Sequence, residues 1–472
     1  TEGGQSRVRI TPQLIRVADD THLWSDTYDR ILDDIFTIQS DLAQQVLAAM
    51  NIALTDSERP TIEVQPTKSL EAYQAYLQGK HLLRQPHFTL DSWNRALATL
   101  EKAVEIDPGF ALAWAQIARA HSRLIYFKVD ASPERSRLAS HALEQAVTSD
   151  PDSPEVHLAA GYYHLWAIRD AEGARREFQI AAEQMPNNAY VLEGLGEAAR
   201  LQGRIDDAID YYSGAAEISP LSASPVVELG LSQWWARRFE EALETANRSI
   251  VLAPDGTWPY LTKTLNEWSW KGGTPRGRSA LEAISSEHPW LPWMWFWQEI
   301  YEGRYREAAE RLDATPGDWV TLKICARPKP LLRSYTLELL ENPEAARTAA
   351  RQAVVMLESK MSDGPEDPRY YSSLGIARAM LGRRDEAVGA GRRAVDLFPL
   401  ARDAIYAQPH VQDLAHSYSL AGEFDEACDQ LGLLLSIPGW TSTTLLEVDP
   451  RWAPLRDQPC YRQLMEEYAG SG

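Results

Sequence analysis

Residues 186–220 read PNNAYVLEGLGEAARLQGRIDDAIDYYSGAAEISP, which is one complete copy of a pattern that returns along the chain. The prolines at 186, 220 and 254 are each 34 residues apart, and a small residue lies twelve and five residues before each of them. The full spacing occurs at Ala96/Ala103/Pro108, Ala139/Ala146/Pro151, Ala174/Ala181/Pro186, Ala208/Ala215/Pro220, Ala242/Ser249/Pro254 and Ala387/Ala394/Pro399. A period of this length indicates a stack of repeated supersecondary units.

The first half of each unit carries a second signal. A leucine followed by glycine precedes the first small residue by about twelve positions at Leu195-Gly196, Leu229-Gly230 and Leu374-Gly375. Small residues at these positions let two helices approach closely, and the proline ends the second helix. One helix pair cannot cover its own apolar face, so neighbouring pairs must stack.

These residues resemble the tetratricopeptide repeat, W-x2-L-G-x2-Y followed by A-x3-F-x2-A and P. The best copies span 188–220, 222–254, 368–399 and 409–438, with looser copies at 70–108, 110–151 and 153–186. Degenerate copies are expected at 256–289, 291–316 and 330–361. The resemblance implies a mainly α fold, a right-handed α-α superhelix of roughly ten helix pairs over residues 70–440.

The two ends depart from the repeat. In residues 1–56, the segments 7–17 and 22–29 predict a β-hairpin, and apolar residues at 38, 42, 46, 49 and 53 predict a helix. Pro12 cannot donate to a strand ladder, so an edge strand or a bulge is expected there. This part resembles the end of a TolB-like domain, which in bacterial signalling proteins often precedes such repeats.

Two further segments complete the predicted organisation. Residues 57–69 hold two prolines among polar residues and predict a linker. Residues 441–472 include LEVDPRWAPLRDQPCYRQLMEEY, which resembles the tail of such arrays and implies a capping segment over the last repeat. The first residue is Thr1, so the chain is interpreted as part of a longer protein or a mature product.

The composition of the chain excludes some classes of binding partner. The net charge is −20 and the pI is near 5.0, which argues against nucleic acid and against anionic membranes as partners. The sequence contains no run of about 18 apolar residues, so a membrane-spanning helix is not predicted. The three cysteines, Cys325, Cys428 and Cys460, show no disulfide framework and no zinc-binding spacing, and one must stay unpaired. The compartment stays open between the cytoplasm of a bacterium and an extracytoplasmic location.

No catalytic, cofactor-binding or metal-binding residues are predicted. The segment 272–279 resembles a phosphate-binding loop, but it lies between two expected helices and has arginine where lysine is needed. The ten histidines show no metal-ligand spacing. An enzyme is therefore not expected, because no set of acid, base and nucleophile converges.

The resemblance implies a docking groove along the first helix of each repeat. Residues expected to face this groove are Arg119, Glu155, Tyr162, Leu165, Tyr190, Glu193, Glu197, Arg200, Leu231, Trp234, Arg369, Gln412 and His416. A second candidate is a tryptophan-rich helix, interpreted either as core packing between repeats or as a protein-binding hot spot. Its residues are Trp290, Trp293, Trp295 and Trp297.

Three functions follow. The first is a non-enzymatic scaffold that binds a protein or peptide partner. The second is a structural subunit that self-associates through its repeat ends and its N-terminal hairpin, forming a filament or oligomer. The third is the sensory or recruiting domain of a larger bacterial signalling protein.

Overall fold

The computed structural model describes residues 7–16, 20–31, 35–50, 65–83, 90–127, 129–272, 274–285, 288, 290–322, 324–362 and 366–469. The fold is mainly α, with a few short strands, as the repeat predicts. It forms two compact units, Thr1–Ala167 and Ile168–Gly472. Among the described residues, none of the helices combines the length and the apolar character needed to cross a membrane.

The first unit begins with paired strands. Strand β1 (Arg7–Ile10) pairs with β4 (Tyr28–Ile31), and β2 (Gln13–Arg16) pairs with β3 (Thr21–Ser25), both antiparallel. Pro12 separates β1 from β2, and the register shifts between Leu14 and Ile15. Helix α1 follows (Ile35–Ala49). Of the predicted linker, residues 57–64 lie outside the described ranges.

Helix pairs occupy the rest of this unit. Helix α3 (Leu70–Leu82) packs on α4 (Leu90–Ile106), and α5 (Ala111–Tyr126) packs on α6 (Pro133–Ser149). Helix α7 (Pro154–Tyr163) continues into a π-helical turn, His164–Ile168. Caps define the starts, since the Ser69 hydroxyl accepts the amide of Ala72 and the Ser132 hydroxyl accepts that of Arg135.

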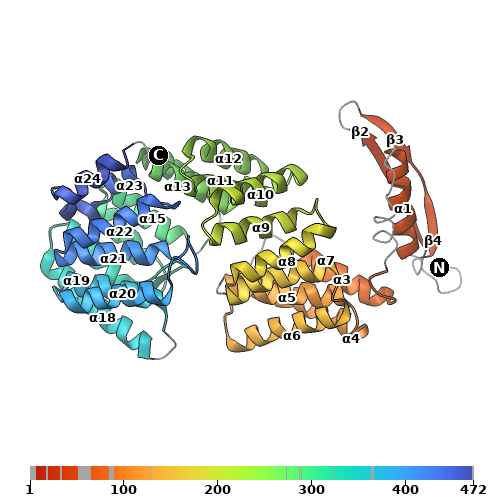
Figure 1. Cartoon of the computed structure of the whole chain (residues 1–472), viewed down its shortest axis with the longest axis horizontal. Helices are drawn as coiled ribbons and strands as arrows, with labels where there is room; N and C mark the ends of the chain where they lie inside the picture. Colours follow the sequence, from red (N-terminus) through yellow and green to blue (C-terminus); the bar gives the residue numbers. More distant parts are fainter. Residues whose placement is uncertain are drawn as a thin grey trace. The chain divides into compact units, whose positions relative to one another are not determined.

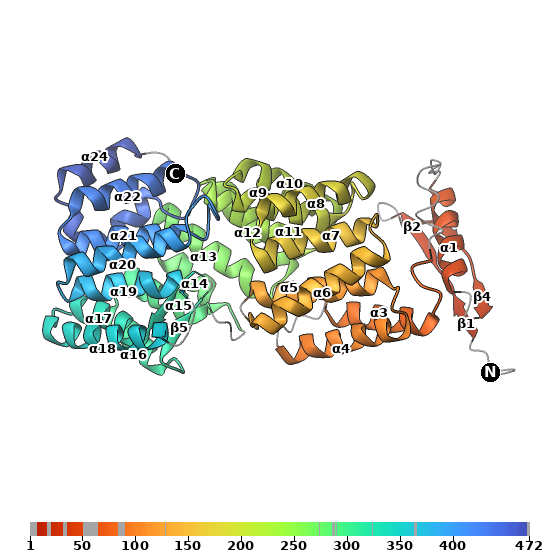
Figure 2. The same ribbon diagram turned by 60° about the horizontal axis from the view of Figure 1, so that its bottom comes forward.

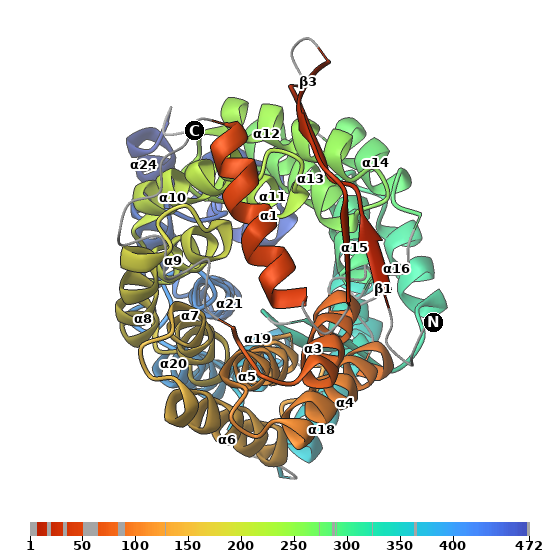
Figure 3. The same cartoon turned by 90° about the vertical axis from the view of Figure 1, so that its right-hand side faces the viewer.

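The second unit continues the same alternation of helices (Figures 1 and 2). Its helices are α8 (Ala171–Gln184), α9 (Ala189–Leu201), α10 (Ile205–Ile218), α11 (Ala223–Trp235), α12 (Phe239–Leu252), α13 (Thr257–Lys271), α14 (Thr274–Glu282), α15 (Leu291–Tyr301), α16 (Tyr305–Ala314), α17 (Lys329–Leu339), α18 (Pro343–Ser362), α19 (Pro368–Met380), α20 (Arg384–Leu397), α21 (Gln408–Ala421) and α22 (Phe424–Ser436). Seen end-on, α8 to α16 follow one another around a curve (Figure 3).

Two non-repeat elements interrupt this unit. Strands β5 (Trp319–Thr321) and β6 (Ala326–Pro328) form an antiparallel hairpin between α16 and α17. After α22 come α23 (Thr443–Val448), a 3-10 helix (Pro450–Leu455) and α24 (Pro459–Glu467).

The recurring small residues lie where helices cross. Their side chains are 0% exposed at Ala96, Ala103, Ala139, Ala146, Ala174, Ala181, Ala208, Ala215, Ala242, Ser249, Ala387 and Ala394. Phe178 and Tyr212 fill the space beside them, and a Cβ added at Gly194 would lie 2.5 Å from the Phe178 ring. Such close packing leaves no room for one more methyl group, which explains why these repeat positions hold only small residues.

One disulfide corrects the sequence analysis. Cys428 on α22 is bonded to Cys460 on α24, which lies 32 positions further along the chain, and their Cα atoms are 6.1 Å apart, while Cys325 is buried and free. The spacing alone could not reveal this pair, because it depends on how α24 packs against α22.

Candidate docking surfaces

The turns between paired helices form the first feature of the second unit. Arg169, Gly203 and Arg237 occupy equivalent turn positions 34 residues apart, and all three have positive φ, 60°, 77° and 58°. Glycine adopts this conformation freely, whereas each arginine pays about 1–2 kcal/mol for it. The arginines therefore need compensating contacts.

These contacts reach the C-terminal half of the unit. The Arg169 guanidinium pairs with Asp403, which is 1% exposed. The Arg237 guanidinium donates to the carbonyl oxygens of Leu434 at 3.1 Å, Ile437 at 3.0 Å and Thr441 at 2.9 Å. Burial lowers the pKa of Arg237, but its carbonyl partners hold the charge in place.

Backbone hydrogen bonds join the same two parts of the second unit, and we call this contact the seam. The amide of Ala404 donates to the carbonyl of Leu201 at 2.8 Å, and the amide of Gly439 donates to that of Trp235 at 2.9 Å. Both acceptors are carbonyls at the C-terminal ends of first helices, α9 and α11, which have no partner within the helix. We call residues 399–407 and 437–449 the covering segments.

The second covering segment continues onto the next first helices. The Ser442 hydroxyl donates to the carbonyl of Ser269 on α13 at 2.6 Å, and the Trp440 indole donates to Gln412 on α21 at 3.3 Å. The segment therefore lies along the helices that would otherwise line a groove.

Beyond this segment, Arg451 enters an aromatic cluster. Its guanidinium lies 4.2 Å from the ring centroid of Trp297 and pairs at 2.5 Å with Asp449, which is fully buried. His416 stands 5.9 Å from the Trp452 ring, and burial holds its pKa well below the usual value. The imidazole is therefore neutral, and the cluster packs as a core.

The β5–β6 hairpin covers the inner side of α19 and α21. Arg327 on β6 donates to both carboxylate oxygens of Asp413 at 2.6 Å and to the Ser373 hydroxyl at 2.9 Å. The two charged side chains are 6% and 4% exposed. One guanidinium nitrogen faces both carboxylate oxygens and the other binds Ser373, so this buried charge-assisted pair fixes the hairpin against the two helices.

The predicted groove residues separate into two groups. Buried at 8% exposure or less are Tyr162, Leu165, Glu197, Arg200, Leu231, Trp234, Gln412 and His416. At least partly exposed are Arg119, Glu155, Tyr190, Glu193 and Arg369. In the second unit, the buried residues present no surface to a partner, because the chain's own segments pack on the helices that carry them.

The tryptophan-rich helix is mainly core. Trp297 is 6% exposed, Trp290, Trp293 and Trp295 are half-buried, and all four belong to one hydrophobic cluster with residues of α13 and α17. The guanidinium of Arg311 lies 4.3 Å from the Trp295 ring centroid. This arrangement favours the core-packing interpretation of the helix.

The first unit has a partly exposed face of arginine and aromatic side chains on α5 and the π-helical turn, backed by the buried rings of Trp93 and Tyr162. Arg119 lies 4.8 Å from the Tyr162 ring centroid, and Arg123 lies 5.4 Å from Trp93, 5.7 Å from Phe127 and 5.9 Å from Trp166. Phe127 is 43% exposed. Arginine and aromatic side chains of this kind dominate binding energy at protein interfaces.

Sequence reasoning missed half of this face. It named Arg119 and Tyr162 but not Arg123 and Trp166, which lie four residues further along each chain segment. The matching i,i+4 pairs on successive first helices were a signal that could have found them.

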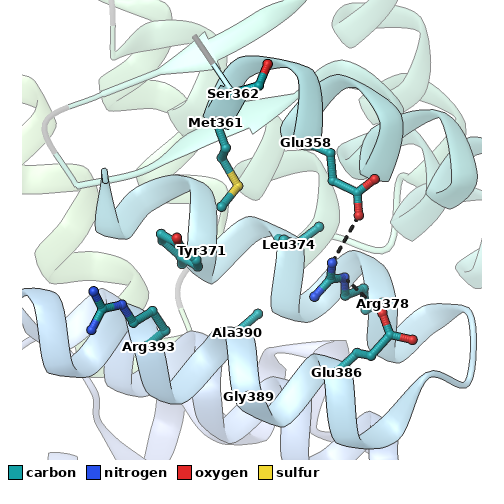
Figure 4. A pocket seen from close by; sticks show the side chains of 10 residues that line it. All are labelled: Glu358, Met361, Ser362, Tyr371, Leu374, Arg378, Glu386, Gly389, Ala390 and Arg393. Atoms are coloured by element: carbon teal, nitrogen blue, oxygen red, sulfur yellow. Dashed lines mark hydrogen bonds and ion pairs between the residues drawn. The ribbon is translucent and has the colours of Figure 1, made fainter. Parts of the chain in front are cut away.

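An outer groove lies between α18, α19 and α20, with a volume of about 530 Å³ (Figure 4). Met361, Leu374 and Ala390 line its middle, and Gly389 leaves open space, since nothing lies within 4 Å of an added Cβ. Charged side chains stand at both ends. They are Glu358, Arg378 and Glu386 at one end and Arg393 at the other.

Comparison with known families supports the repeat assignment. The family model for the tetratricopeptide repeat matches residues 163–223 and 337–402. A curated relative from Rhizobium meliloti (strain 1021), named "Putative adenylate cyclase 3", is 29% identical over 165 residues, which are 35% of this chain and 28% of the relative. The chain thus spans less than a third of the length of that relative.

Solved structures with similar helical arrays share little sequence. The type IV pilus biogenesis factor PilW is 17% identical, with 45% of this chain and 92% of PilW covered and a TM-score of 0.37. A human IFIT1 dimer with m7Gppp-AAAA is 16% identical, with 76% of this chain and 77% of IFIT1 covered and a TM-score of 0.42. A tetratricopeptide repeat protein from Parabacteroides merdae is 14% identical, with 52% of this chain and 93% of that protein covered and a TM-score of 0.40. Similarities of this size carry no argument about ligands. The family-model matches, together with the helix pairs and their buried small residues, show that the chain contains tetratricopeptide repeats.

Proposed function

We propose that the chain is a protein-binding scaffold whose first unit receives partner segments on the α5/α7 face. The observation that supports this is the contrast between the two units. In the second unit, most of the predicted groove residues are covered by the chain itself, with Tyr190, Glu193 and Arg369 as the partly exposed exceptions. In the first unit, Arg119, Arg123, Tyr126, Phe127 and Trp166 all stay at least partly exposed.

The chemistry of this face suits a peptide. The partly exposed ring of Trp166 lies 4.2 Å, centroid to centroid, from the buried ring of Tyr162, which supports it from behind. Trp166 lies in the π-helical turn, a distortion that often occurs at functional sites. The guanidiniums beside the rings can bind a carboxylate or a backbone carbonyl of the partner.

Peptides selected from a random display library against the intact chain test this proposal. We expect Arg123→Ala and Trp166→Ala each to weaken binding of the selected peptides by about tenfold or more, as at interface hot spots. Dissociation constants measured by fluorescence anisotropy give the readout.

Lys102→Ala on α4 is the matched control, because the Lys102 side chain is 59% exposed on a second helix. The proposal fails if peptides selected on the wild type bind all three variants equally well.

We further propose that the scaffold is the recruiting part of a larger signalling protein. The similarity to a segment of a protein named as an adenylate cyclase supports this role. Deleting residues 70–440 from the full-length protein should abolish partner recruitment in a co-precipitation assay, and unchanged recruitment would contradict the role.

A further inference from the structure

We propose that the disulfide between Cys428 and Cys460 acts as a redox-sensitive switch. While the bond is intact, it holds helix α24 on α22, and its reduction releases α24. The two helices lie side by side within the second unit (Figures 1 and 2). The switch concerns this unit alone and does not depend on the α5/α7 face.

Helix α24 has few features that would stabilise it as a helix by itself. It has nine residues, which is fewer than an isolated helix needs to be stable in water. The Gln458 side chain makes no capping hydrogen bond, and the first turn holds no acidic residue. The last turn holds Glu466 and Glu467 and no basic residue, so its charges oppose the helix macrodipole. The helix therefore depends on its contacts with the rest of the chain.

The non-covalent contacts of α24 come from one face. Its buried side chains are Tyr461 and Leu464. The Tyr461 hydroxyl donates to the carbonyl of Leu446 at 3.0 Å. Leu464 packs on Gly432 of α22, where an added Cβ would lie 3.3 Å from the Leu464 side chain. The disulfide adds a covalent attachment one turn before Leu464, so α24 cannot leave α22 while the bond is intact.

The segment before α24 is held independently of the disulfide. Trp452 and Leu455 in the 3-10 helix are 0% exposed. The Arg451 guanidinium donates to the buried Asp449 carboxylate at 2.5 Å. These anchors end at Leu455, four residues before α24 begins at Pro459. Opening after reduction is therefore expected to stop between these two residues.

The two bonded cysteines differ in access to solvent. Cys428 is 6% exposed, whereas Cys460 is partly exposed. A thiolate of an external dithiol can therefore attack the Cys460 sulfur, which breaks the disulfide and releases Cys428 as a thiolate that takes up a proton. The second thiol of the dithiol then attacks the mixed disulfide and frees Cys460. The dithiol is oxidised to its own disulfide, and the chain gains two electrons and two protons.

The third cysteine takes no part in this exchange. Cys325 is 3% exposed, and burial raises the pKa of its thiol to about 12. The thiol therefore stays protonated at neutral pH, and a protonated thiol does not attack a disulfide. The state of the switch is set by the dithiols in solution, not by exchange within the chain.

Hydrogen–deuterium exchange of the intact chain, equilibrated with oxidised or with reduced dithiothreitol, tests this inference. After denaturation, the oxidised chain should show one thiol that reacts with iodoacetamide and the reduced chain three. We expect peptides from α24 to exchange about tenfold faster or more in the reduced chain, because the cross-link no longer opposes local opening. Peptides from α21 and from the 3-10 helix should keep their rates.

Two variants complete the test. Cys460→Ser cannot form the bond, so its α24 should exchange fast in oxidised and in reduced dithiothreitol. Cys325→Ala is the matched control, because it removes only the free thiol and should leave the response of α24 unchanged.

Three outcomes would overturn the inference. The first is equal exchange of α24 in the oxidised and the reduced wild type. The second is three reactive thiols in the chain treated with oxidised dithiothreitol. The third is an equal acceleration of α21 and of the 3-10 helix, which would show that the bond holds the whole C-terminal part instead of α24.

Discussion

Asp413→Ala is expected to lower the free energy of unfolding of the second unit by about 3–5 kcal/mol. The substitution leaves the Arg327 guanidinium buried at 6% exposure without its carboxylate. The remaining partner, the Ser373 hydroxyl, accepts one hydrogen bond but carries no charge. Urea denaturation followed by circular dichroism measures the loss.

Two further variants separate the buried charge from general damage. Glu134→Ala breaks an exposed pair, in which the Glu134 side chain is 62% exposed and that of Arg137 is 66% exposed, and should cost far less than Asp413→Ala. The double variant Arg327→Met/Asp413→Leu should recover most of the stability, because no unpaired charge is left. A loss for Asp413→Ala as small as that for Glu134→Ala would show that the hairpin does not pack as described.

Trp452→Ala is expected to cost about 3–5 kcal/mol, since a large fully buried ring leaves a cavity. Trp452 is 0% exposed and packs in a cluster with Leu414, Leu431 and Leu446. The residue stands in the 3-10 helix beyond the covering segments, so the loss reports how firmly the C-terminal part is held. Thermal and urea unfolding of the intact chain measure it.

Trp452→Phe is the matched control. The indole nitrogen of Trp452 has no hydrogen-bond partner among the described residues, so phenylalanine removes volume but no polar contact. Its cost should stay well below that of alanine. Equal stability of the alanine variant and the wild type would mean that the C-terminal segment is not part of the core.

The spacing of the small residues and prolines was predictable because it depends only on contacts within one repeat. Ala208 and Ala215 must be small to let two helices cross, and Pro220 must follow the second helix, so their spacing appears directly in the sequence. Gly203 is local in the same sense, because the turn between the two helices needs positive φ there, which glycine adopts freely.

The covering of the first helices was not predictable from the period. Arg237 contacts the carbonyl oxygen of Thr441, which lies 204 residues further along the chain, and Arg327 pairs with Asp413 across 86 residues. The repeat places each helix against its neighbours but contains no information about segments that return from far along the chain. The structure therefore buries residues such as Trp234 and Gln412, which the sequence analysis expected to face a groove.

Arg237 also shows what the sequence could have offered. An arginine at the turn position where Gly203 stands in the preceding repeat breaks the local preference for glycine. Such a departure indicates that the side chain makes contacts worth more than the backbone strain.

Hydrogen–deuterium exchange of the intact chain, read by mass spectrometry, tests most directly whether the second unit covers its own first helices. The amides of Ala404 and Gly439 lie outside helices but donate to Leu201 and Trp235. We predict that peptides containing these two amides exchange as slowly as the helices α9 and α11, because opening them requires breaking the seam. Exchange at the rate of an exposed loop would show that the groove is open and would contradict this account.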